Sequence, residues 1–192
     1  MEGCGMRRFF IDMDGVLAKW ENASLEEMTS PGFFLSRKVD ENVCGMVNQL
    51  LEKQIAENIE VYILSSYLLP ISKEEKIQWN EQYTHIPIER QIYVPYGENK
   101  AEALGCIGGI KPGDVLVDDF TKNLNEWQGV AVKLYNGING THGTWQGFSI
   151  HNKMTPDKMV SQLDGISMME SMRIRMQEQE QSVVRNKVAG KR

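Results

Sequence analysis

Short apolar runs alternate along this chain with segments of helical period, and that alternation limits the possible folds more than any other feature. Four runs share a β-branched or aromatic character and end at a polar residue or a turn: residues 8–11, 60–64, 114–117 and 130–134. Runs of this length, without apolar–polar alternation, are typical of strands that helices cover on both sides. The sequence therefore predicts an α/β protein with a Rossmann-like, three-layer α/β/α fold and a parallel central sheet.

Segments between the runs supply the helices of this fold. Apolar residues recur at helical spacing between residues 40 and 58, so we expect a long helix there. Shorter segments predict four more helices, at residues 18–28, 73–83, 100–104 and 123–128. Residues 137–147 are rich in Gly, Asn and Thr and indicate a loop, in which we expect His142 to be solvated.

One core with two additions is the organisation that we expect. Residues 1–160 form the core, and a small helical insertion, the cap, interrupts it at about residues 18–42, after the first strand. Residues 161–192 form a helix with a polar tail. Three methionines share one face of that helix because they lie four residues apart: Met168, Met172 and Met176. Two interpretations fit this face: the helix docks on the core and frays, or it binds a partner.

Composition and charge narrow the function classes. The formal net charge is −5, which argues against binding to a nucleic-acid polymer. No apolar run is long enough to cross a membrane, and the polar start of the chain is unlike a signal peptide. The three cysteines are far apart and predict reduced thiols rather than a zinc site. We therefore expect a cytoplasmic protein without a membrane or nucleic-acid partner.

Two carboxylates follow the first predicted strand. Asp12 and Asp14 would lie in the crevice where α/β sheets bind ligands, and Gly15 lets the chain turn directly afterwards. Neighbouring acids repel each other, so a cation or a proton is expected beside them. A plain turn is the alternative interpretation. An EF-hand loop would need acids at further alternate positions and a terminal Glu, but Val16, Leu17 and Ala18 follow here, so that interpretation fails.

Three further polar groups come at the ends of later strands or at the helix start beside them. Ser65 and Ser66 follow the second run and suit either a phosphate contact or a helix cap. Lys100 opens a predicted helix, where it would neutralise a phosphoryl group or simply be a surface lysine. Asp118 and Asp119 follow the third run and are equally consistent with a metal site and with a helix cap.

In this order the Asp-x-Asp, Ser, Lys and Asp-Asp groups resemble the four motifs of the haloacid dehalogenase (HAD) superfamily of phosphatases. The match covers most of residues 8–135. The resemblance implies that Asp12 attacks phosphorus and forms an aspartyl phosphate. It also implies that Asp14 protonates the leaving oxygen and then deprotonates the attacking water. The expected fold is then a HAD fold with a small cap.

The remaining motifs complete the implied site. By the same resemblance Ser65, with Ser66 beside it, would hold a phosphate oxygen, and Lys100 would steady the nucleophile and the phosphoryl group. Mg²⁺ is the implied cofactor. The groups that would bind it or support its ligands are Asp12, the backbone carbonyl of Asp14, Asp119, Asp118 behind it, and Asn123.

Within this superfamily the chain resembles the 5′(3′)-deoxyribonucleotidase family. The segments that carry the likeness are residues 12–18, Gly32-Phe33-Phe34, Glu75-Lys76-x-x-Trp79, and Val117-Asp118-Asp119 with Asn123. The likeness implies that Phe33 and Phe34 contact the nucleobase, and a small apolar cap core is the alternative. Two features differ: the cap is shorter than in the animal enzymes, and Ser65-Ser66-Tyr67 stands where that family has Thr-Ser-Pro.

Three functions are compatible with these expectations. The first is a Mg²⁺-dependent phosphomonoester hydrolase for (deoxy)nucleoside monophosphates, and the second is a HAD phosphatase for another small phosphoester, such as a sugar phosphate. The third is a non-catalytic protein that acts through its C-terminal helix, which the complete set of acids argues against. The expected partner is a small phosphorylated substrate, and a homodimer would be one way to cover a site with so small a cap.

Overall fold

Six parallel strands form one sheet at the centre of the protein. In this computed structural model, which describes residues 6–138 and 145–189, the strands are β1 (Arg7–Ile11), β2 (Ile59–Tyr67), β3 (Gln91–Pro95), β4 (Val115–Asp118), β5 (Val130–Tyr135) and β6 (Phe148–His151). All neighbours pair in parallel, in the order β3-β2-β1-β4-β5-β6. The order reverses direction between β1 and β4, and ligands bind at such a point in open α/β sheets.

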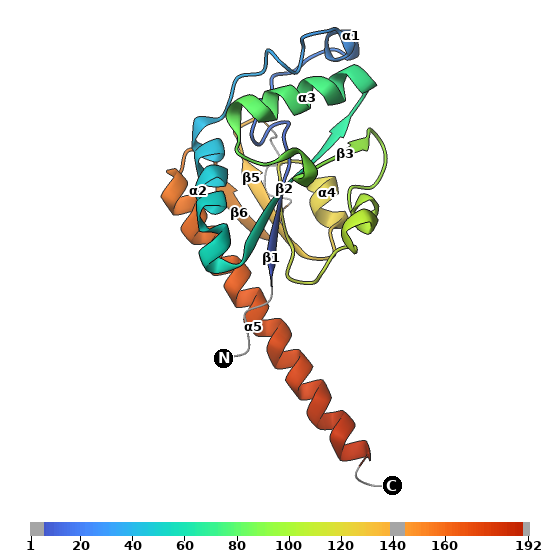
Figure 1. The fold of residues 1–192 in the computed structure, drawn as a ribbon, viewed down its shortest axis with the longest axis vertical. Coiled ribbons are helices and arrows are strands. Elements are labelled where there is room, and N and C mark those ends of the chain that lie inside the picture. The colour runs from blue at the N-terminus through green and yellow to red at the C-terminus, as the bar shows by residue number, and fades with distance from the viewer. Residues whose placement is uncertain (1–5, 139–144, 190–192) are drawn as a thin grey trace.

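Helices cover both faces of the sheet (Figure 1). On one side α2 (Glu41–Glu57) packs against the first part of α5 (Pro156–Ala189), and α3 (Pro70–Tyr83) lies near the carboxyl ends of the strands. On the other side lie the 3₁₀ helix η2 (Glu102–Ile107) and α4 (Thr121–Glu126). The remaining described helices are α1 (Leu25–Thr29), in the cap, and η1 (Ile88–Arg90). The fold is therefore a Rossmann-like, three-layer α/β/α arrangement.

Successive residues of β1 point into the two layers on either side of the sheet. Phe9 and Ile11 belong to the larger core, under α2 and α5, and both are fully buried. Phe10 belongs to the smaller core. Its ring stacks on that of Tyr62 with a centroid distance of 5.1 Å and packs edge to face with Trp127 at a centroid distance of 5.4 Å. Burying each of these side chains contributes about 2 kcal/mol. The central strand is thus fixed from both sides directly before Asp12.

The parallel sheet and four of its strands, β1, β2, β4 and β5, confirm the prediction from the apolar runs. The edge strands β3 and β6 were not predicted. At an edge a strand is only partly covered, and both sequences contain polar residues, Gln-Ile-Tyr-Val-Pro in β3 and Phe-Ser-Ile-His in β6. In β6 polar residues interrupt the apolar ones, and in β3 the short run Ile92-Tyr93-Val94 ends at Pro95, a residue that is typical of edge strands.

Two predicted helices differ from those in the structure. The expected helix at residues 18–28 is wrong in extent, because only Leu25–Thr29 is helical; Ser24 caps it in a capping box with Glu27. The helix expected at 100–104 is the 3₁₀ helix η2 instead. Residues 139–144, with His142 among them, lie outside the described residues.

The C-terminal helix has a packed part and a projecting part. It begins at Pro156 rather than at residue 161, and its first turns bury four side chains of the larger core: Met159, Val160, Leu163 and Ile166. Farther along, α5 extends away from the sheet (Figure 1), and Met168, Met172 and Met176 are exposed. Across the described ranges no helix combines the length and apolar character that crossing a membrane requires.

Candidate active site

Three aspartates converge where the carboxyl ends of β1 and β4 lie side by side. Asp12 follows β1 directly, Asp118 is the last residue of β4, and Asp119 comes next. The backbone amide of Asp12 donates to the carbonyl of Val117 at 3.0 Å, so the pairing of β1 with β4 continues into the site. One carboxylate oxygen from each aspartate lies within 4.8 Å of the others, and all three residues are buried. Parallel pairing thus brings two motifs together that are distant in the sequence.

Lys100 neutralises part of this cluster. Its Nζ lies 2.9 Å from Asp12 Oδ1 and 2.8 Å from Asp118 Oδ2. Burial lowers the pKa of Lys100, but the charges of Asp118 and Asp12 outweigh this effect, so the pKa is raised and the ammonium group stays charged. One cation is therefore shared between the first and the last motif.

The cluster contains more carboxyl groups than the single ammonium group of Lys100 can balance when they are ionised. Burial raises the pKa of Asp119 to about 8, and the carboxylates of Asp12 and Asp118 add to this effect. Burial also raises the pKa of Asp118. Three carboxylates around one ammonium group leave a charge that a divalent cation would balance, and hard oxygen donors suit Mg²⁺. The donor set therefore fits the ion that the sequence predicts.

Polar side chains orient the two adjacent aspartates. Asn123 Nδ2 donates to Asp118 Oδ2 at 2.8 Å, and Asn136 Nδ2 donates to Asp119 Oδ2 at 2.7 Å. Lys133, fully buried in β5, donates to the backbone carbonyl of Asp119 at 2.9 Å. These donors hold the carboxylates in place, as the supporting residues of a metal site usually do.

Gly15 brings the backbone close to the acids. Its φ of +75° lies in the region that favours glycine, and a Cβ at this position would come within 2.0 Å of Asp119 Oδ2. Asn136 Nδ2 donates to the Gly15 carbonyl at 2.8 Å as well as to Asp119. A side chain at residue 15 would therefore displace Asp119.

Asp14 interacts with a different lysine from the one that serves the cluster. Lys76 of α3 is fully buried, and its Nζ lies 2.5 Å from Asp14 Oδ2. The Asp14 side chain keeps 26% of its surface exposed and borders a cavity. Burial raises the pKa of Asp14, Lys76 opposes that shift, and the charge of Asp12 adds to it. A carboxyl group with a raised pKa beside a cavity is suited to donating a proton.

The two serines of the second motif occupy different places. Ser65 is fully buried in β2, and its Oγ accepts a hydrogen bond from Lys76 Nζ at 3.2 Å. Ser66 borders the cavity, and its backbone carbonyl accepts from Lys76 Nζ at 2.5 Å. Ser65, which the sequence favours as the phosphate contact, is not among the residues that line the cavity.

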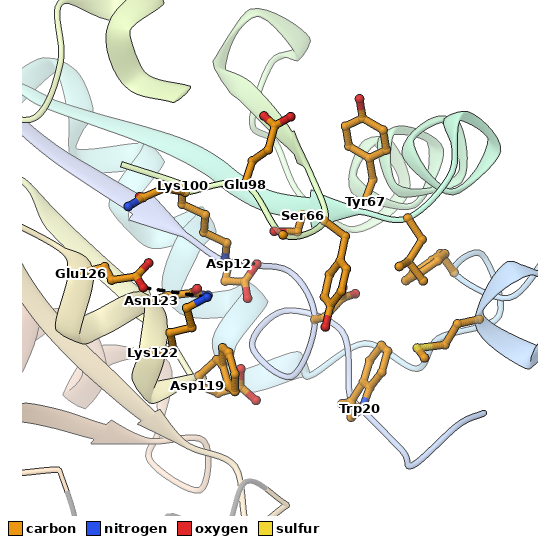
Figure 2. Close-up of a pocket in the computed structure, with 18 of the residues that line it drawn as sticks. Asp12, Trp20, Ser66, Tyr67, Glu98, Lys100, Asp119, Lys122, Asn123 and Glu126 are labelled. Carbon is orange, nitrogen blue, oxygen red and sulfur yellow. Dashed lines mark ion pairs between the residues drawn. The ribbon is translucent and has the colours of Figure 1, made fainter. Parts of the chain in front are cut away.

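A cavity of about 690 Å³ opens in front of the acids (Figure 2). Asp12, Lys100 and Asp119 lie together at its polar end, and Asn123 is beside them (Figure 2). The side chains that form most of its other walls are aromatic or apolar: Trp20, Leu25, Met28, Phe34, Tyr67, Leu68, Tyr96 and Phe120. This volume suits a ligand of the size of a nucleotide.

The two phenylalanines of the cap have different environments. Phe34 is 2% exposed and still lines the cavity. Phe33 does not line the cavity. Its ring packs edge to face on the rings of Trp20 and Phe34, with centroid distances of 6.0 Å and 5.0 Å. The Arg37 guanidinium lies over the Phe33 ring, 4.2 Å from its centroid. The structure therefore brings Phe34 to the cavity and places Phe33 in a small aromatic cap cluster.

Three polar residues of the site were given no chemical role in the prediction. Lys76 lies in a predicted helix, three residues before Trp79, and that spacing could have shown that both face inward. Lys133 lies inside a predicted strand, where a buried lysine needs polar partners. Asn136 follows that strand, so its place at the carboxyl edge of the sheet was the available signal.

Comparison with known proteins adds no family to this description. No protein-family model matches the chain, and no curated protein matches it. The function is therefore inferred from the fold, the residues and their geometry.

Proposed function

We propose that this protein is a Mg²⁺-dependent phosphomonoester hydrolase of the HAD type, with Asp12 as a covalent nucleophile. The observation that carries the proposal is the cluster of Asp12, Asp118 and Asp119 around Lys100, with Asp14 two residues beyond the nucleophile. The cluster lies at the point of the sheet where α/β folds bind ligands. A nucleophile, an acid, a fixed cation and a set of metal donors are the parts that phosphoryl transfer requires.

In the first step an Asp12 carboxylate oxygen bonds to phosphorus, and the bond from phosphorus to the leaving oxygen breaks. The leaving oxygen takes a proton from Asp14, which becomes a carboxylate. Lys100 positions the Asp12 carboxylate for attack, because its Nζ lies 2.9 Å from Asp12 Oδ1. The alcohol then leaves, and an aspartyl phosphate remains.

In the second step a water molecule attacks phosphorus and gives a proton to Asp14. The bond between phosphorus and the Asp12 oxygen breaks, so both aspartates return to their starting forms and inorganic phosphate is released. Asp14 is suited to both steps, since its surroundings raise its pKa while it still borders the cavity.

Mg²⁺ would be held by Asp12, Asp119 and the Asp14 backbone carbonyl, with Asp118 supporting them. When bound, it would offset the negative charge of the phosphoryl group and of the acids. Asn123 and Asn136 keep Asp118 and Asp119 oriented for this role.

The aromatic walls favour a nucleoside monophosphate as substrate. Trp20, Phe34, Tyr67 and Tyr96 offer ring surfaces on which a nucleobase would pack, with its phosphate toward Asp12. The 690 Å³ cavity has room for the sugar as well. A sugar phosphate is the second candidate, because Ser66, Asn99 and Glu98 supply polar contacts at the same cavity.

Hydrolysis of p-nitrophenyl phosphate with and without Mg²⁺ tests the reaction. We expect turnover that EDTA removes and that Asp12→Asn abolishes, because an amide cannot form the acyl phosphate. Lys158→Met, an exposed change on α5, is the control and should keep full activity. No turnover by the unchanged protein across several phosphoesters would favour a non-catalytic role. A panel of deoxynucleotides and sugar phosphates then tests the substrate, and faster turnover of sugar phosphates would overturn the nucleotidase.

A further inference from the structure

We propose that Lys76 is a positioning residue for the reaction: it holds Asp14 in the orientation from which Asp14 protonates the leaving oxygen, and it ties that orientation to the cap. The inference rests on the proposed function and adds a residue to it. Lys76 lies in α3, outside the sheet that carries the other charged residues of the site.

All three donors of the Lys76 ammonium group are used. Nζ lies 2.5 Å from Asp14 Oδ2, 3.2 Å from Ser65 Oγ and 2.5 Å from the Ser66 carbonyl. An ammonium group has three N–H bonds and accepts none, so these contacts fix its direction. The side chain is fully buried, which makes the charged pair with Asp14 stronger than it would be in water.

This arrangement holds one oxygen of Asp14 and leaves the other without a partner. Oδ2 accepts from a group that can only donate, so the contact fixes the orientation of the carboxyl group. Within the described residues Asp14 Oδ1 is buried and has no hydrogen-bond partner. A buried polar atom without a hydrogen-bond partner lowers the stability of the fold. Such an atom can serve a function where a substrate supplies the missing hydrogen bond. Lys76 therefore engages Oδ2, and the hydrogen-bonding capacity of Oδ1 stays unused.

Helix α3 connects this lysine to the cap. The neighbouring carboxylate of Glu75 accepts from the backbone amides of Gly32 at 2.5 Å and Phe34 at 3.1 Å. The ammonium group of Lys76 itself lies 4.7 Å from the centre of the Phe34 ring. One turn of α3 thus fixes both the cap wall at Phe34 and the acid at Asp14.

Leaving groups of different basicity test the proposal. An alkoxide needs a proton as it leaves, whereas p-nitrophenolate leaves without one, so misplacing the acid should slow the two esters unequally. In the full-length protein, Lys76→Met should lower kcat for a nucleoside 5′-monophosphate at least tenfold more than kcat for p-nitrophenyl phosphate. Lys76→Arg keeps the charge and should restore part of that ratio, and Lys158→Met should leave it unchanged. If Lys76→Met does not fold, as judged by thermal unfolding, Lys76→Gln takes its place.

A double-mutant cycle shows whether Lys76 acts through Asp14. In an Asp14→Asn background, adding Lys76→Met should change kcat for the nucleotide by less than twofold, because the group that Lys76 positions is already gone. Equal losses on the two esters, or losses that multiply in the double variant, would overturn the inference and leave the proposed function intact. Absence of turnover by the unchanged protein on every phosphoester would instead overturn the proposed function, and this inference with it.

Discussion

Asp119→Asn should stabilise the protein in the absence of divalent cations and at the same time abolish its Mg²⁺-dependent activity. Asp119 is 4% exposed, and burial with the charges of Asp12 and Asp118 raises its pKa from an ordinary 3.8 to about 8. Asparagine has almost the same shape and keeps an oxygen that can accept from Asn136 Nδ2. The substitution therefore removes the charge and retains the hydrogen bond that orients the side chain.

The size of the effect follows from the displaced pKa. When the pKa of a group is higher in the folded than in the unfolded protein, the group contributes its full stability at pH values below its unfolded pKa. This contribution is lost as the pH rises through the folded pKa. Here that loss extends from about pH 4 to about pH 8. At roughly 1.4 kcal/mol per pKa unit, Asp119 lowers the free energy of unfolding at pH 7 by up to about 4 kcal/mol. Asp119→Asn should recover most of this at pH 7 and little near pH 4.

Urea unfolding in EDTA at pH 5, 6, 7 and 8, followed by tryptophan fluorescence, measures this difference. As the control, Glu178→Gln removes an exposed carboxylate on α5 and should shift the free energy of unfolding by less than about 0.5 kcal/mol at every pH. Adding Mg²⁺ should stabilise the unchanged protein, most strongly at pH 8, and should not stabilise Asp119→Asn. A variant no more stable than the unchanged protein at pH 7, or a difference that does not grow with pH, would refute the reasoning.

Three further substitutions separate stability from substrate binding. Gly15→Ala should cost about 1–3 kcal/mol in urea unfolding, because the Cβ would lie 2.0 Å from Asp119 Oδ2 at a φ of +75°; an unchanged midpoint would contradict this. Arg8→Met should cost about 3 kcal/mol, since it leaves buried Asp114 without its guanidinium partner, and a loss below 1 kcal/mol would count against it. Phe34→Ala should raise KM for a nucleoside monophosphate roughly tenfold more than KM for p-nitrophenyl phosphate, if the ring packs on the base; equal changes would remove Phe34 from base binding.

Short-range patterns made the centre of the fold predictable, and long-range packing hid the rest. The runs that became β1 and β4 each contain three consecutive apolar residues, 9–11 and 115–117, and Asp12 and Asp118 mark where they meet the crevice. Parallel strands end at one edge of a sheet, so the convergence of these acids could be predicted without knowing their distances. The edge strands β3 and β6 were not predicted, because polar residues interrupt β6 and the run in β3 is short and ends at a proline.

The contacts of the cap could not be predicted from local pattern. Lys76 reaches Asp14 across 62 positions of sequence, and Glu75 reaches Gly32 across 43. Nothing in the period of a helix says which distant group a buried lysine will meet. The separation of Phe34, in the cavity wall, from Phe33, in the aromatic cluster, depends on the same tertiary packing.

Two aspartates only two residues apart can take opposite parts in one reaction because different lysines hold them. Lys100, in the turn before η2, binds Asp12 and shares its charge with Asp118 of β4, so the attacking carboxylate stays with the acids that would hold the metal. Lys76 binds Asp14 from α3, beneath the cap, where burial raises the pKa of Asp14 and favours the protonated form. Different surroundings for two carboxyl groups can in this way separate a nucleophile from an acid. The carboxyl edge of the sheet therefore carries the acids of the site, and the helix under the cap positions the proton donor. A change in the cap at Phe34 should for this reason affect proton transfer as well as substrate binding.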